Sequence, residues 1–201
     1  MAPARPVCQR GIRVTILLIV LVSVPNRGAG GTTDSMPADD PFARHSWNIE
    51  LAGQVELEAW NYNTNHEELY GLITALTYGL GKGVVITATV PITYVSQRGV
   101  DGLLLGGTIG VRGRVYRRAR LSIYWEFSVG ASQADTFVPP RGTRFNYIAQ
   151  GGGGATLRVA RGLHALAAVR WIHLSNNGLA GRDRNPDIEA IGMHVGVLMP
   201  F

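Results

Sequence analysis

The sequence predicts an all-β fold, a transmembrane antiparallel β-barrel of about eight strands. Apolar residues recur at every second position through about eight segments between Ser46 and the end of the chain. The chain also has 26 glycines, and no apolar run beyond its first 30 residues is long enough for a spanning helix. Because the segments are long and even in number, they fit a transmembrane barrel better than a soluble sandwich, whose strands average about five or six residues.

The N-terminal residues predict export across the inner membrane. Three arginines, at positions 5, 10 and 13, precede the apolar run 14–22, and the small residues 28–30 follow it. This is the pattern of a secretory signal peptide, and the run falls short of the roughly 20 residues of a spanning helix. We therefore predict a signal peptide over 1–30, an N-terminal periplasmic segment over 31–45 and an outer-membrane β-barrel over 46–201.

Charge and cysteine content exclude several classes of function. Removing the four arginines at positions 5, 10, 13 and 27 from the 19 basic residues leaves 15 against 14 acidic ones. The high pI is therefore mostly a property of the targeting segment, and no basic face for nucleic acid remains. The single cysteine, Cys8, lies before the apolar run, so the processed chain has no disulfide, thiol nucleophile or lipid anchor. We expect no cofactor and no metal.

Each predicted strand has one apolar face. The first is the clearest, because Trp47, Ile49 and Leu51 alternate with Asn48 and Glu50, an order that a helix would scatter around its circumference. The residues expected on the outward faces of the following segments are Tyr70 to Leu80, Val84 to Tyr94, Leu103 to Val115, Leu121 to Val129, Phe145 to Val159, Leu163 to Trp171 and Ile191 to Phe201, each at every second position.

The connections between these segments predict the orientation of the barrel. Short turns are expected at 81–83, 117–119 and 161–162, and longer connections at 61–69, 97–102, 133–143 and 177–187. Outer-membrane barrels have short periplasmic turns and long external loops. The long connections are therefore expected outside the cell.

Charged side chains on the inward parity predict a filled interior. They are Glu50, Glu56, Glu58, Arg112, Arg114, Glu126, Arg158 and Arg170. A barrel of eight strands is filled by side chains, and buried charges must be paired. We interpret these residues as a structural network of ion pairs and hydrogen bonds rather than as a transport path.

Three polar residues depart from the outward apolar pattern. Continuing the parity beyond Trp171 places His173 and Ser175 on the outward face, and extending the last segment backward places Glu189 there too, provided no bulge intervenes. Side chains two apart on a strand lie about 6.5 to 7 Å apart at the backbone, so His173 and Ser175 can meet. A hydroxyl, an imidazole and a carboxylate are the parts of an acyl-transfer triad, with His173 as base and Glu189 as its orienting group.

The oxyanion of such a reaction needs hydrogen-bond donors. Asn176 and the backbone amides near Gly178 follow the serine directly and are the candidates.

The segment from Trp171 to Leu179, followed by Asn185-Pro186-Asp187-Ile188-Glu189, resembles the outer-membrane lipid A 3-O-deacylase family, often called PagL-like. That family has a His-x-Ser-Asn motif and then an Asn-x-x-Ile-Glu motif near its C-terminus. The stretch Pro139 to Asn146 is also similar to a family segment. The resemblance implies His173, Ser175 and Glu189 as the triad and Asn176 as an oxyanion contributor.

The resemblance also implies a substrate, lipid A or lipopolysaccharide, hydrolysed at its 3-position ester in the outer leaflet of the outer membrane. Outer-membrane lipids are then the expected surroundings, and nucleic acid is not a partner. Two alternatives stay open at this point, a non-enzymatic structural or adhesion barrel and an outer-membrane phospholipase. The oligomeric state is not predicted.

Overall fold

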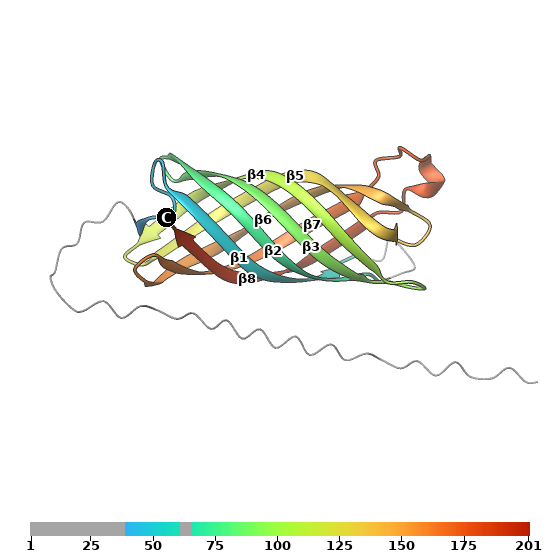
Figure 1. Cartoon of the computed structure of the whole chain (residues 1–201), viewed down its shortest axis with the longest axis horizontal. Coiled ribbons are helices and arrows are strands. Elements are labelled where there is room, and N and C mark those ends of the chain that lie inside the picture. Colours follow the sequence, from blue (N-terminus) through green and yellow to red (C-terminus); the bar gives the residue numbers. More distant parts are fainter. Residues whose placement is uncertain (1–38, 61–65) are drawn as a thin grey trace, which may run out of the picture. The chain divides into compact units, whose positions relative to one another are not determined.

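The computed structural model describes residues 39–60 and 66–201, and over them the chain forms a closed barrel of eight antiparallel strands (Figure 1). Each strand pairs with the next, and the last pairs with the first to close the cylinder. The strands are β1 (Trp47–Glu58), β2 (Glu68–Gly81), β3 (Val84–Ser96), β4 (Gly102–Arg118), β5 (Leu121–Val138), β6 (Thr143–Ala160), β7 (Leu163–Ser175) and β8 (Ile188–Pro200). The predicted fold class is confirmed.

The residues that alternate in the sequence also alternate in burial along the strands, with the apolar set exposed on the outside. In β1 the residues from Trp47 to Leu57 alternate between exposed and buried. Large apolar side chains cover the outer wall, among them Ile49, Leu72, Val90, Leu105, Phe127, Val169 and Met193. Since closure pairs the backbone groups of every strand on both sides, these side chains are free to face a hydrocarbon solvent.

The two ends of the barrel differ. We call the end with the short connections the turn end and the opposite one the loop end (Figure 1). The connections at the turn end comprise residues 82–83, 119–120 and 161–162. The turn predicted at 117–119 lies later, because Arg117 and Arg118 still pair with Ser122 and Leu121 of β5.

One connection at the loop end is shorter than predicted. The stretch 133–143 was expected to be a loop, but β5 continues to Val138, which pairs with Thr143 after a register shift. Residues 139–142 alone make this connection. The longest connection within the described residues is 176–187, the orange-red segment beyond β7 in Figure 1, and it includes a short 3-10 helix at Arg182–Arg184.

The interior of the barrel is arranged in layers. Toward the loop end, apolar side chains fill it, including Leu69, Val95, Leu104, Ile148 and Leu174. A charged layer follows, in which Arg112 lies 2.9 Å from Glu50 and 3.0 Å from Glu126, and Arg170 lies 2.5 Å from Glu126. The predicted pairing of the inward charges is present in this layer.

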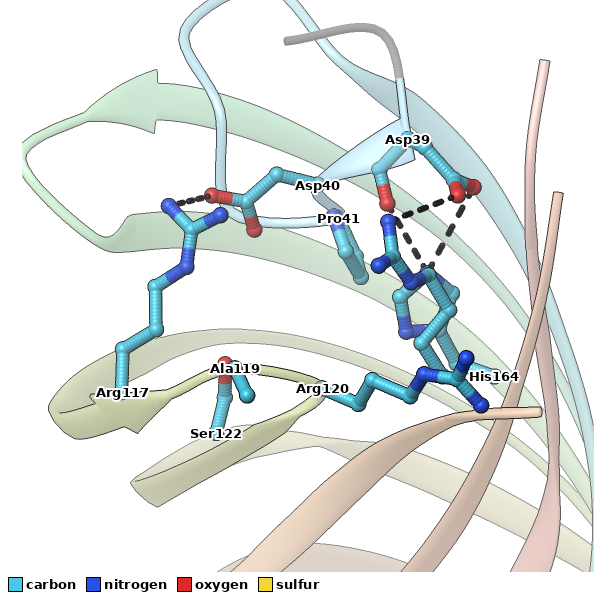
Figure 2. A pocket seen from close by; sticks show the side chains of 9 residues that line it. Asp39, Asp40, Pro41, Arg117, Ala119, Arg120, Ser122 and His164 are labelled. Atoms are coloured by element: carbon cyan, nitrogen blue, oxygen red, sulfur yellow. Dashed lines mark hydrogen bonds and ion pairs between the residues drawn. The ribbon is translucent and has the colours of Figure 1, made fainter. Parts of the chain in front are cut away.

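A short segment before β1 covers the turn end. Asp40 pairs with Arg114 at 2.8 Å, and the ring of Phe42 lies 6.0 Å from that of Tyr124 inside the barrel. Asp39 accepts a hydrogen bond from the backbone amide of Gly162. Figure 2 shows the small polar pocket between this segment and the β4–β5 turn, with Asp39 and Asp40 directed toward the basic side chains that line it.

The predicted signal peptide and the larger part of the predicted 31–45 segment lie outside the described residues. Among the residues that the structure does describe, no helix is long and apolar enough to cross a membrane.

Candidate active site

The ends of two paired strands bring the three candidate residues together at the loop end. Ser175 is the last residue of β7, His173 lies two positions before it, and Glu189 is the second residue of β8. His173 and Glu189 are directly opposite each other in the β7–β8 register. All three positions share the outward parity, because no bulge interrupts the pairing between these strands.

A continuous chain of hydrogen bonds joins the three side chains. His173 Nδ1 lies 2.8 Å from Glu189 Oε1, and His173 Nε2 lies 3.0 Å from Ser175 Oγ. When Nδ1 donates to Glu189, the Nε2 lone pair is directed at the serine hydroxyl. In that tautomer the imidazole can accept the proton of Ser175.

The inner side of the barrel wall behind these hydrogen-bonded side chains is apolar and buried. The residues that alternate with the three point inward and are buried: Ile172, Leu174, Ile188 and Ala190, all in the apolar cluster at the loop end. Ser175 is only 6% exposed, whereas the side chains of His173 and Glu189 keep 28% and 23% of their surface open. The imidazole and the carboxylate are therefore partly exposed on the outer surface, whereas the serine is mostly covered.

The two predicted oxyanion residues organise the loop after β7. Asn176 is buried and bonds twice through its side chain: its amide nitrogen donates to the carbonyl oxygen of Arg184, and its Oδ1 accepts from Gly178 N at 2.9 Å. The backbone amide of Asn176 donates to Asn185 Oδ1 at 2.9 Å. These bonds fix the loop beside Ser175, and the oxyanion role of Asn176 and Gly178 stays a prediction.

Two residues near the site were not among the predicted ones. Trp171 Nε1 donates to Glu189 Oε2 at 2.6 Å. Asp187 places a carboxylate oxygen within 4.8 Å of ligand atoms of His173 and Glu189, a set of the kind that holds a divalent cation. Trp171 shares the outward parity of His173, two residues before it, so the same period-two count would have included it, whereas Asp187 lies just before β8 begins.

The arrangement is suited to acyl transfer. A hydroxyl, an imidazole and a carboxylate are linked in that order on a partly open surface, while buried apolar side chains line the inner side of the wall. Fold and site together define an outer-membrane β-barrel that carries a hydrogen-bonded serine, histidine and glutamate on its lipid-facing wall.

Comparison with known proteins identifies the family. The model of the lipid A 3-O-deacylase (PagL) family matches residues 30–197, and the chain belongs to this family. The resemblance seen in the motifs of the last two strands is thereby confirmed. A search of curated proteins finds no match.

Solved structures share the barrel at low sequence identity. The neisserial surface protein A is similar with a TM-score of 0.59 and 8% identity, over 77% of this chain and 97% of that one. The outer membrane enzyme PagL is similar with a TM-score of 0.51 and 16% identity, over 77% of this chain and 99% of that one. OprG from Pseudomonas aeruginosa has a TM-score of 0.51 at 11% identity, over 79% and 96%. At these identities the similarity supports the fold.

Proposed function

We propose that this protein is a serine esterase that hydrolyses the 3-position ester of lipid A in the outer leaflet of the outer membrane. Membership of the lipid A 3-O-deacylase family supports the substrate. The single observation that carries the mechanism is the hydrogen-bonded chain from Ser175 through His173 to Glu189 on the outward face of β7 and β8.

The first half of the reaction acylates the serine. His173 Nε2 takes the proton of Ser175 Oγ as the oxygen attacks the ester carbonyl. The tetrahedral intermediate collapses by breaking the bond between the carbonyl carbon and the 3-oxygen of the sugar, and His173 returns its proton to that leaving oxygen. Glu189 stabilises the imidazolium that exists between these two transfers.

Water completes the second half. His173 removes a proton from a water molecule, the hydroxide attacks the acyl-enzyme, and the bond to Ser175 Oγ breaks as the oxygen regains a proton from His173. The products are a 3-hydroxy fatty acid and lipid A with a free hydroxyl at the 3-position. For the oxyanion, Asn176 has a second side-chain amide hydrogen beyond the one that it donates to Arg184, whereas the Gly178 amide would have to give up its bond to Asn176 Oδ1.

The position of the site favours a lipid ester as substrate. His173, Ser175 and Glu189 lie near the loop end, and long loops face the outside in outer-membrane barrels. Exposed apolar side chains, among them Val169, Ile191 and Met193, continue along the wall from the site. An acyl chain can therefore stay in the hydrocarbon layer while its ester reaches the serine.

The test is mass spectrometry of lipid A incubated with the purified barrel in detergent. Loss of one 3-hydroxyacyl chain is the expected product. Ser175→Ala should abolish it, whereas Ser132→Ala, a matched change at a buried serine of the lumen, should leave it unchanged. Activity that survives in Ser175→Ala contradicts the mechanism.

The same assay separates the alternative functions. Release of fatty acid from glycerophospholipid, with lipid A left intact, would identify a phospholipase that uses the same serine. Absence of any Ser175-dependent ester hydrolysis in a folded barrel would identify a structural or adhesion protein.

A further inference from the structure

The carboxylate of Glu189 has a second donor that the triad does not include. His173 Nδ1 lies at Glu189 Oε1, and the indole Nε1 of Trp171 donates to Glu189 Oε2 at 2.6 Å. Each carboxylate oxygen therefore has its own donor. Trp171 also stacks against the imidazole, with ring centroids 6.0 Å apart and an angle of 25° between the planes.

The register of the two strands allows this contact. Trp171 is opposite Ile191, so Glu189 is its diagonal neighbour across the β7–β8 pair. Diagonal neighbours lie about 7 to 8 Å apart at the backbone, a distance that an aromatic side chain spans. Trp171, His173 and Ser175 are three successive outward residues of β7, so one row of side chains supplies both donors to Glu189 and the nucleophile.

A second donor matters more on this wall than in water. An ionised carboxylate beside hydrocarbon is stable only when its oxygens are hydrogen-bonded. A lysine or arginine in this place would introduce a competing positive charge next to the imidazole, whereas an indole donates one hydrogen without charge and is favourable near a lipid interface. Two donors also fix the plane of the carboxylate, and that plane orients the imidazole.

We propose that Trp171 is a positioning residue of the reaction, which holds Glu189 through Oε2 and the imidazole of His173 through ring stacking. This inference rests on the proposed function for the triad. It assigns to Trp171 a role separate from that of an apolar residue anchoring the barrel at the membrane surface, because the role requires the indole N–H and not only the ring.

The first experiment removes the N–H and keeps an aromatic ring. Trp171→Phe should lower kcat for deacylation about tenfold, the effect of one hydrogen bond to a charged group, with KM within about twofold of the wild-type value. The matched control is Trp125→Phe on the outward face of β5, which should leave both constants unchanged. A Trp171→Phe protein as active as the wild type overturns the proposal.

A double-mutant cycle separates positioning from a general structural effect. In a Glu189→Ala protein no carboxylate is left to position, so adding Trp171→Phe should change the residual rate by less than about twofold. An equal tenfold loss in both backgrounds overturns the proposal, because the indole would then act independently of Glu189.

A spectroscopic measurement covers the case in which Trp171→Phe does not fold. In protein labelled with ¹⁵N at tryptophan, the indole proton of Trp171 should resonate downfield as a strong hydrogen bond and move upfield in Glu189→Ala. An indole resonance that does not respond to Glu189→Ala overturns the contact itself.

The proposed function can fail without the inference failing. If lipid A is not cleaved but a simple aryl ester is hydrolysed in a Ser175-dependent way, the cycle is run on that ester and tests Trp171 alone. If lipid A is cleaved and the cycle shows no coupling, only the role of Trp171 is wrong.

Discussion

Two carboxylates, one inside the barrel and one on its outer surface, each lie between two hydrogen-bond donors. The two arrangements differ in the chemistry that they allow. In the lumen, Glu126 accepts from Arg112 and Arg170. On the outside, Glu189 lies between His173 and Trp171. The donors of Glu126 are permanent cations, whereas those of Glu189 are an imidazole that can gain and lose a proton and an indole that stays neutral.

The lumen network and the outward site also differ in solvent exposure. The side chains of Arg112 and Glu50 are 3% and 1% exposed, so the lumen network is closed to solvent. The outward group of Glu189, His173 and Ser175 is partly exposed, and it ends at the Ser175 hydroxyl rather than at another charge. A closed set of permanently charged donors has no proton to transfer, whereas a set with one exchangeable proton beside a hydroxyl can carry out chemistry.

The largest expected effect is on the outward face. Ser175→Ala removes the proposed nucleophile and His173→Ala the proposed base, so each should leave little deacylation above background. Glu189→Ala removes the orientation and charge support of the imidazole and should lower kcat by about four orders of magnitude, less than either of the others. Rates measured by mass spectrometry of lipid A check this order.

All three variants should still fold, because each change removes a polar group from an apolar face and leaves the strand pairing intact. Heat-modifiable migration on gels measures folding. A folded Glu189→Ala protein with wild-type rate would show that the two carboxylates do not differ in role.

A change in the lumen network should lower stability and leave the activity of the folded protein unchanged. Glu126→Gln leaves Arg112 and Arg170 without their shared carboxylate, and breaking a buried pair costs about 3 to 5 kcal/mol. We expect a lower urea midpoint in vesicles and an unchanged rate for the fraction that remains folded. If folded Glu126→Gln lost activity as fully as Ser175→Ala, the lumen charges would belong to the catalytic machinery.

A smaller effect is expected from a carboxyl group that no cation pairs with among the residues that the structure describes. Glu67, just before β2 at the loop end, is buried, and its carboxyl group lies beside that of Glu58. Burial raises the pKa of Glu67 from 4.5 to about 8, and the nearby Glu58 adds to the rise, since a protonated Glu67 supplies a donor that an ionised pair lacks.

The sign of the pH dependence follows from this shift. The folded state holds the Glu67 proton between pH 4.5 and about 8, where the unfolded chain has lost it, so stability should fall as pH rises through that window. The slope is at most about 1.4 kcal/mol per pH unit, because one proton is involved. Glu67→Gln should flatten urea midpoints measured from pH 5 to 9, while the exposed neighbour change Glu68→Gln should not. An unchanged slope in Glu67→Gln contradicts this account.

Much of the site was predictable because side-chain parity is a local property. Residues two apart on a strand share a face whatever the partner strand does, so His173 and Ser175 could be placed together on the outside from their spacing alone. The inward charges followed from the same rule. Local sequence does not report where pairing ends, and the extension of β5 to Val138 was missed for that reason.

The sequence by itself determined the class of fold, and it predicted the face on which each strand residue lies and the three candidate residues His173, Ser175 and Glu189. Only the tertiary structure decided that Glu189 stands opposite His173 and that Trp171 reaches its second oxygen. The physical reason is register: one residue of slip in β8 would turn Glu189 into the lumen. Register is set by loop length, bulges and barrel closure together, and these connect parts of the chain that no local pattern relates.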